Sequence, residues 1–339
     1  MNDPSAHHIA YYHLPGLFEN YALYARFLPL YRAHREYFYD GCDIGSIYGA
    51  PEDCLWSGGR ISDGTADVRD VLALLRAYGI SGRLTFSNTV LQEAHLADPR
   101  CNLLIQLFSE ETEGGFTRTH SVNIGTEASP LSLSPSDETN NGSKNPGAPQ
   151  NGVIVASDLL TRYLEKQYPS LYLVSSTTKV LTHFDDFEKE LARPDFRYVV
   201  PDFRLNKSWE ALAELPDTAK AKVEFLANEC CDFGCTERKA CYEAVSRIAL
   251  GLSGPAHHCH APHAAEGYRF SLAMKNPGFI SLDDIQKRYL PMGFSQFKIE
   301  GRGLGSALIL EFLLYYMTRP EHQLEVREAL YLDNMLDLF

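Results

Sequence analysis

Five of the eight cysteines of this chain lie within thirty residues of one another: Cys230, Cys231, Cys235, Cys241 and Cys259. Histidines accompany the last of them in the run His257-His258-Cys259-His260. Thiols at this density either form disulfides in an oxidising compartment or bind zinc or an iron–sulfur cluster. The residue types therefore predict a disulfide framework or a metal centre in this segment.

The beginning of the sequence favours the metal centre. A secretory signal needs a basic start and then an uninterrupted apolar run, but His7, His8, Glu19 and Asn20 interrupt the apolar positions. No later stretch reaches membrane-spanning length without a charge. We therefore expect a cytoplasmic protein without a membrane anchor, in a reducing compartment where disulfides are rare.

Composition describes an ordinary globular enzyme. The 339 residues are 45% hydrophobic and 22% charged, enough for a large core. The net charge of -13 and the pI near 5.4 disfavour broad binding to nucleic acid, which depends on clustered Lys and Arg.

The spacing of the cysteines leaves two metals open. Three residues separate Cys231 from Cys235, five follow before Cys241, and seventeen before Cys259. Thiolates suit both zinc and iron–sulfur, and neither is excluded by these gaps. Because Cys230 and Cys231 are neighbours, we expect one of them not to be a ligand. The isolated Cys42, Cys54 and Cys101 are expected to be small buried hydrophobes.

The elements that must position these residues alternate along the chain, because short β-branched runs are separated by segments of helical period. Eight strands are predicted, at 42–48, 83–86, 153–156, 171–175, 197–201, 222–227, 268–273 and 294–299. Eight parallel strands close an α/β barrel of the TIM type. The rival is a doubly wound open sheet, but no Gly-rich dinucleotide turn follows the first strand.

Helix signals lie between the strands. Val68 to Leu75 has helical spacing before Gly79, Asp98-Pro99 is typical of a cap and first turn, and Ser281 with Asp284 is a capping box. We expect one barrel domain over residues 1–339 with a helical tail at 318–339. Residues 110–150 are rich in Ser, Thr, Asn, Gly and Pro, so we expect a long mobile insertion.

The cysteine segment directly follows the strand predicted at 222–227. In an α/β barrel the active site forms at the carboxyl ends of the strands, where side chains from different strands converge. The polar residues predicted to line this mouth are Asn88, Lys179, Asn206, Asn228, Glu229, Glu300 and Arg302. Arg302 could bind a carboxylate or phosphate, or Glu300 and Arg302 could pair with Lys298 or Arg238 to close the barrel.

Two motifs resemble the U32 family of collagenase-like peptidases. The first is Asn228-Glu-x-Cys231-x-x-x-Cys235-x-x-Arg238, and the second, more specific, is Phe297-Lys-Ile-Glu-Gly-Arg302. The resemblance extends over roughly residues 40 to 317, without the insertion and the termini.

This resemblance implies a barrel that holds a 4Fe-4S cluster, in a family with members that hydroxylate ubiquinone precursors or RNA bases without oxygen. It implies Cys231, Cys235, Cys241 and Cys259 as ligands, with His257, His258 or His260 as substitutes where related sequences carry histidine in place of Cys241. It also implies a small-molecule or RNA substrate and, in some members, a paralogous partner protein. From their place at the predicted mouth, Glu229, Glu300 and Arg302 are the candidate catalytic residues.

Three functions follow from the sequence. The first is an iron–sulfur oxidoreductase of the oxygen-independent hydroxylation type. The second is a peptidase, although neither a Gly-x-Ser-x-Gly elbow nor a His-Glu-x-x-His helix occurs in the sequence. The third is a non-catalytic barrel whose loops are held by a metal and whose surface binds a partner.

Overall fold

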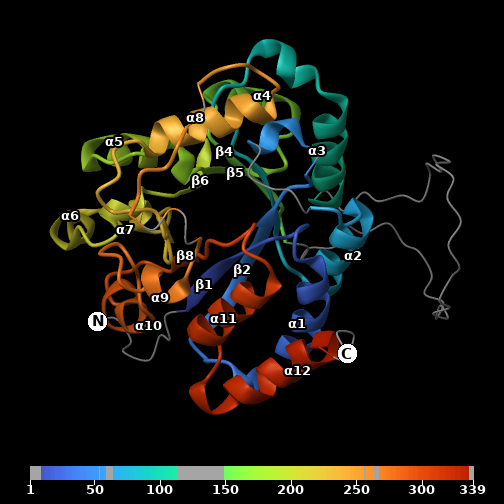
Figure 1. Ribbon diagram of the computed structural model, residues 1–339, viewed down its shortest axis with the longest axis vertical. Helices are drawn as coiled ribbons and strands as arrows, with labels where there is room; N and C mark the ends of the chain where they lie inside the picture. The colour runs from blue at the N-terminus through green and yellow to red at the C-terminus, as the bar shows by residue number, and fades with distance from the viewer. Residues whose placement is uncertain are drawn as a thin grey trace, which may run out of the picture.

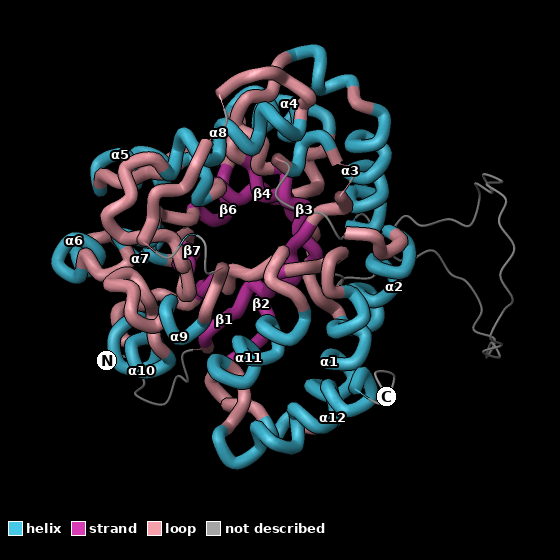
Figure 2. The backbone as a smooth tube through the Cα atoms, viewed as in Figure 1, coloured by secondary structure: helices cyan, strands magenta, loops and turns pink. Residues whose placement is uncertain are grey.

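Eight parallel strands form a nearly closed barrel in the computed structural model, which describes residues 9–52, 54–58, 64–112, 149–255, 257–262, 264 and 267–335. The strands are β1 (Ala10–Pro15), β2 (Cys42–Gly49), β3 (Gly82–Phe86), β4 (Gly152–Val155), β5 (Tyr172–Ser175), β6 (Phe196–Val199), β7 (Glu224–Leu226) and β8 (Gln296–Lys298). Figure 1 shows the path of the chain, and Figure 2 shows the ring of strands with the helices outside it. The expected TIM-type α/β barrel is confirmed.

The ring has one weak junction. The sheet order is β6-β5-β4-β3-β2-β1-β8-β7, so β1 joins the beginning of the chain to its last strand. Between β6 and β7 there is only an isolated parallel bridge of Val199 with Val223, in which the Val199 N–H donates to the Lys222 carbonyl at 2.8 Å. This isolated bridge brings the two end strands of the sheet together without a continuous ladder.

Seven predicted strands lie at or within a few residues of observed ones, and one prediction is wrong. Residues 268–273 do not form a strand, because Phe270–Ala273 is the short helix α9, in which Phe270 packs against Phe312 with ring centroids 4.8 Å apart. The missing eighth strand is β1, which lies before the region that resembles a known family.

Helices cover the outside of the barrel. They are α1 (Tyr21–Ala33), α2 (Val68–Tyr78), α3 (Pro99–Thr112), α4 (Asp158–Gln167), α5 (Phe184–Leu191), α6 (Trp209–Glu214), α7 (Asp217–Lys220), α8 (Arg238–Ala249), α9 (Phe270–Ala273), α10 (Leu282–Asp284), α11 (Ser306–Tyr316) and α12 (Gln323–Met335). Single turns are η1 (Arg35–Tyr37), η2 (Leu55–Ser57), η3 (Glu93–Ala97), η4 (Thr177–Lys179), η5 (Phe203–Leu205), η8 (Pro320–His322) and the π-helix η7 (Ile285–Tyr289).

The expected helix signals are present. Asp67 caps α2 by accepting from the Arg69 N–H, and Gly79 ends it in the left-handed conformation at φ 66°. Ser281 and Asp284 form the capping box of α10. Part of the expected insertion is helical, since α3 continues to Thr112, and its residues 113–148 lie outside the described residues.

The three isolated cysteines are buried, as expected, but two of them are not alone. Cys54 and Cys101 are free thiols whose sulfur atoms lie 3.2 Å apart, between the loop after β2 and helix α3. No helix within the described parts of the chain is both long enough and apolar enough to cross a membrane.

A charged cluster fills the interior of the barrel. Glu224 is fully buried, accepts from Arg83 Nη1 at 2.5 Å, and lies 3.6 Å from Lys298 Nζ and 3.4 Å from His13 Nε2. Burial would raise the pKa of Glu224, but the charge of Arg83 outweighs it and lowers the pKa to about 2. Burial lowers the pKa of Lys298 to about 7, although Glu224 opposes this. The barrel therefore has an ionic interior beneath its mouth.

Candidate metal centre

The cysteine loop begins where β7 ends, at the carboxyl-terminal mouth of the barrel. Within it the thiols of Cys231 and Cys235 are in hydrogen-bond contact. Burial, and then the negative charge of Glu229, raises the pKa of Cys231 to about 12. This thiol is therefore protonated in the metal-free protein, and a metal ion must displace its proton to bind.

Glu229 holds the backbone of this loop. Its Oε1 accepts hydrogen bonds from the N–H groups of Cys230 at 3.1 Å and Cys231 at 3.0 Å. Its Oε2 accepts from Nη2 of the fully buried Arg238, in the first turn of α8. One carboxylate therefore ties the thiol-bearing loop to the helix that follows it.

A second acid extends this network to β6. Asp202, which follows β6, accepts from Arg238 Nη1 at 2.7 Å and from Arg204 Nε at 2.6 Å. Arg204 Nη1 in turn donates to the Cys235 carbonyl at 2.6 Å. Burial would raise the pKa of Asp202, but the hydrogen bond from Arg204 and the charge of Arg238 outweigh it and lower the pKa. The loop is therefore held at Cys231 and Cys235 by two arginine–carboxylate pairs.

Cys241 and Cys259 lie near the beginning of α8. The Cys241 N–H donates to the carbonyl of Glu237, the residue that precedes this helix, at 2.9 Å. The Glu237 side chain also lies 3.2 Å from Nδ1 of His260, one residue after the exposed Cys259. The two later cysteines are therefore brought to the same end of one helix, with His257 and His258 in the same segment.

Zinc and a four-iron cluster, the two metal centres left open by the sequence, need different spacings of their thiolate ligands. Tetrahedral zinc with bonds of about 2.3 Å needs thiolates about 3.8 Å apart. Within the described residues, the group of three His, Cys, Asp or Glu ligand atoms that lie within 4.8 Å of one another consists of Glu229, Cys230 and Glu300, not of the four predicted cysteines. A four-iron cluster takes one thiolate on each iron and needs wider spacing, and the four predicted cysteines are free thiols.

The group of Glu229, Cys230 and Glu300 was not predicted as a unit. Glu300 follows β8, so this group joins the ends of two neighbouring strands. Burial, and then the charges of Glu300 and Glu229, raises the pKa of Cys230, which keeps this thiol protonated. Cys230 was expected to be redundant with Cys231, but it lies beside the carboxylates while Cys231 contacts Cys235.

Arg302 has a partner that the sequence did not indicate. Its Nη1 lies 3.9 Å from Oε1 of the buried Glu19, in the loop after β1. Burial raises the pKa of Glu19, although the charge of Arg302 opposes this. Glu19 could not be assigned to the mouth from sequence, because β1 itself was not predicted. Arg302 and Glu19 follow β8 and β1, so this ion pair joins the ends of two neighbouring strands.

The remaining predicted pocket residues hold parts of the fold together. Asn228 donates to the Glu300 carbonyl at 3.2 Å and accepts from the Glu300 N–H at 2.7 Å. Asn206 Nδ2 donates to the carbonyls of Leu226 and Gly278, both at 2.8 Å.

Asn88 and Lys179 make similar structural contacts. Asn88 Nδ2 donates to the Ser246 carbonyl at 3.3 Å, which ties the end of β3 to α8. Lys179 Nζ donates to Glu190 Oε1 at 2.6 Å, in a charged group between α4 and α5. The structure thus places Asn228 beside Glu229 and Glu300, and directs Lys179 toward the outer helices.

The fold and the site define an α/β barrel with a thiol-rich mouth. No family model and no curated protein sequence matches the chain. Among solved structures, that of the U32 peptidase Mk0906 aligns with 89% of this chain and 96% of its own, at 13% sequence identity and a TM-score of 0.44. This neighbour carries the name of the family that the two motifs resemble, and at this identity no residue role transfers from it.

Proposed function

We propose that this chain is an iron–sulfur oxidoreductase that binds a 4Fe-4S cluster through Cys231, Cys235, Cys241 and Cys259. The observation that carries the proposal is the contact of the Cys231 and Cys235 thiols in a loop fixed by Glu229 and Arg238 at the mouth of the barrel. A loop held in advance loses less conformational freedom when the ligands bind.

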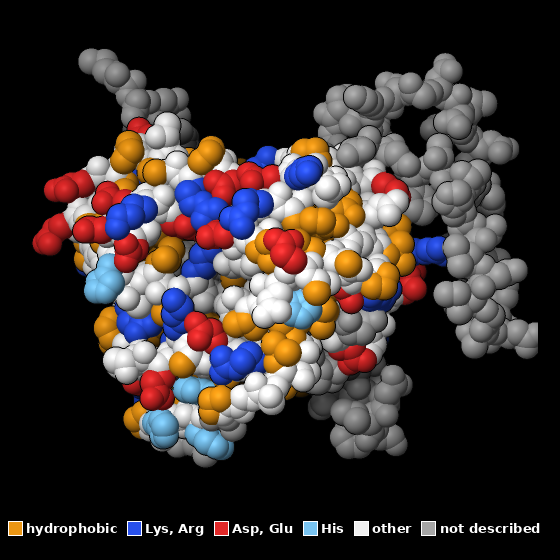
Figure 3. Space-filling view, turned by 90° about the horizontal axis from the view of Figure 1, so that it is seen from above, with side chains coloured by type: hydrophobic (Ala, Val, Ile, Leu, Met, Phe, Trp, Pro, Cys, Tyr) orange, Lys and Arg blue, Asp and Glu red, His pale blue; other side chains and the backbone are white. Residues whose placement is uncertain are grey.

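The substrate would be a small molecule or an RNA base, and the reaction class hydroxylation without molecular oxygen. Insertion of a water oxygen into a C–H bond releases two protons and two electrons, so an external electron acceptor is required. A bound cluster would supply one-electron transfer at this mouth. Figure 3 shows acidic and basic side chains intermixed on one face, so the net charge of -13 still leaves local basic groups for an anionic substrate or a partner protein.

Three residues beside the cysteine loop would act on that substrate. Glu300 lies next to Cys230 at the end of β8 and would accept a proton from the substrate or from water. Arg302, beside Glu19, would bind an anionic group such as a carboxylate or phosphate. Glu229 would position the loop, because its oxygens already accept two loop N–H groups and Arg238.

The proposal is tested by anaerobic purification followed by quantification of iron, acid-labile sulfide and zinc, together with a visible spectrum. We expect about four iron and four sulfide per chain. Cys231→Ser and Cys235→Ser should each lose the cluster, whereas the matched neighbour variant Cys230→Ser should retain it. Retention of iron in Cys231→Ser would refute the ligand assignment.

A hydrolase is the second candidate, because Glu229, Cys230 and Glu300 bring two carboxylates and one thiol within 4.8 Å. Such a mixed set could hold a single divalent cation that activates water. This candidate predicts zinc without sulfide, peptide turnover by the pure protein, and loss of both in Cys230→Ser. The two functions are therefore distinguished by which neighbouring cysteine controls the metal content.

A further inference from the structure

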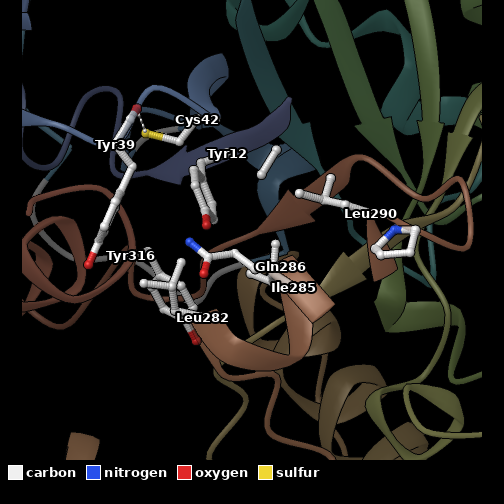
Figure 4. A pocket seen from close by; sticks show the side chains of 11 residues that line it. Tyr12, Tyr39, Cys42, Leu282, Ile285, Gln286, Leu290 and Tyr316 are labelled. Atoms are coloured by element: carbon white, nitrogen blue, oxygen red, sulfur yellow. Dashed lines mark hydrogen bonds between the residues drawn. The ribbon is translucent and has the colours of Figure 1, made fainter. Parts of the chain in front are cut away.

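A cavity of about 310 Å³ lies at the end of the barrel opposite to the cysteine loop. It is bounded by the amino-terminal ends of β1 and β2, by the approach to β8 and by helices α10, η7 and α11 (Figure 4). This volume falls within the range of small-molecule sites in proteins. The side chains that line it include Tyr12, Tyr39, Cys42, Leu282, Gln286 and Tyr316.

The lining carries no ionised side chain, which limits the ligand to an uncharged molecule. A buried ion without a counter-charge would be strongly disfavoured there. Burial raises the pKa of Tyr12 far above its usual value and raises that of Cys42 to about 11, so both groups remain neutral.

The polar groups of the cavity differ in whether they are hydrogen-bonded. The Cys42 thiol donates to the Tyr39 carbonyl at 3.2 Å, and the Tyr316 hydroxyl donates to the Ile280 carbonyl at 2.9 Å. The Tyr12 hydroxyl is fully buried and has no hydrogen-bond partner within the described residues. Figure 4 shows it directed toward Gln286. Since buried hydroxyls are normally paired, this phenol is a donor available to a ligand.

The wall that carries Gln286 has an unusual backbone. Residues Ile285–Tyr289 form a π-helix directly after α10. Such turns are rare and occur frequently at functional sites. This one brings the Gln286 amide, a donor and an acceptor, to the same cavity as the Tyr12 hydroxyl.

We propose that this cavity binds a neutral, flat, largely apolar small molecule whose carbonyl-type oxygen accepts a hydrogen bond from Tyr12. The rings of Tyr12, Tyr39 and Tyr316 supply the apolar walls, and Gln286 supplies a second polar contact. This site is independent of the cysteine loop and of the chemistry proposed there.

The probe for this site is acetophenone, a neutral aryl ketone, compared with ethylbenzene, which lacks the acceptor, and benzoate, which is charged. Dissociation constants are measured by ligand-observed saturation-transfer NMR on the full chain. We expect acetophenone to bind, ethylbenzene to bind about fivefold more weakly for lack of one hydrogen bond, and benzoate not to bind. A cavity that holds only water would show no saturation of any probe, and this result would overturn the proposal.

Variants locate the binding. Tyr12→Phe removes only the hydroxyl. It should raise the dissociation constant of acetophenone about fivefold and leave that of ethylbenzene unchanged. Tyr11→Phe removes the hydroxyl of the preceding residue, which does not line the cavity. It should change neither dissociation constant. Leu282→Trp fills the cavity from a half-buried position and should abolish the binding of both acetophenone and ethylbenzene. If that variant does not fold, Gln286→Leu at an exposed position removes the second polar contact and should weaken the binding of acetophenone. Equal binding of acetophenone to the wild type, Tyr12→Phe and Leu282→Trp would contradict the assignment.

Discussion

Arg238 and Asp202 form a fully buried ion pair, with Nη1 of the arginine 2.7 Å from Oδ2 of the aspartate. The arginine belongs to α8 and the aspartate follows β6, so this pair crosses the weak junction of the barrel. The same guanidinium reaches Glu229 after β7. One side chain therefore links the ends of both strands at that junction with the cysteine loop.

Replacement of Arg238 by methionine should destabilise the protein by about 3–5 kcal/mol, because two buried carboxylates lose their common partner. Urea denaturation measures this change. The matched control is Lys239→Met at the neighbouring exposed position of α8, where a change within about 0.5 kcal/mol is expected. Equal stabilities of the two variants would show that the buried pair has no role in holding the loop.

The buried Lys298 makes the free energy of unfolding change with pH in the alkaline range. Its pKa is about 7 in the folded protein and near the usual 10.5 in the unfolded chain, so between these values the unfolded state binds more protons. Stability from this group therefore rises with pH from about 7 to 10.5, by at most about 1.4 kcal/mol per pH unit.

We expect Lys298→Met to flatten that slope and to raise stability at pH 7, measured by urea unfolding at pH 7, 8 and 9. The control is Lys287→Met, an exposed position paired with Asp283, which should keep the wild-type slope. If the slope of Lys298→Met matched that of the wild type, the buried ammonium would not be its source.

The thiols should react in an order set by exposure and pKa. In metal-free protein, N-ethylmaleimide should modify the exposed Cys259 first and leave the buried Cys42, Cys54 and Cys101 unmodified until urea is added. The raised pKa of Cys230 should make it slower than its exposure suggests. Mass spectrometry of digested protein follows each site. Early labelling of Cys101 would contradict the packing of α3 against the loop after β2.

Asn228 provides a test of the junction between β7 and β8. Asn228→Ala removes three hydrogen bonds, including the one from the Glu300 N–H, and leaves buried backbone groups unpaired. A loss of about 2–4 kcal/mol in urea denaturation is expected. Asn276→Ala removes two hydrogen bonds, one donated to the Cys231 carbonyl and one accepted from the Gly278 N–H, and should cost roughly two thirds as much.

The barrel could be predicted from sequence because seven strands are short apolar runs between helical segments. β1 could not, because its inward side chain His13 is polar and its last residue is Pro15, so Ala10–Pro15 does not read as an apolar run. The alternation of Tyr268, Phe270 and Leu272 suggested a strand, whereas Phe270 packs against Phe312 and Tyr315 of α11 from a helical turn.

The position of the cysteine loop was predictable, since it follows β7 directly in the chain. The side chains that surround the loop could not be predicted, because Asp202 and Glu19 follow β6 and β1, which are far away in sequence. The sequence also does not say that Cys230 contacts Glu300 while Cys231 contacts Cys235. These choices depend on side-chain directions that are set by the closed ring of strands.

Because a single bridge between Val199 and Val223 joins them, β6 and β7 are the two edge strands of the sheet. β6 pairs along its length with β5, and β7 pairs with β8, whereas β6 and β7 share this one bridge within the described residues. Hydrogen exchange should therefore be fastest there among the strands of the barrel. The cysteine loop begins where β7 ends, so we expect a local opening of this junction to move the proposed cluster ligands with it.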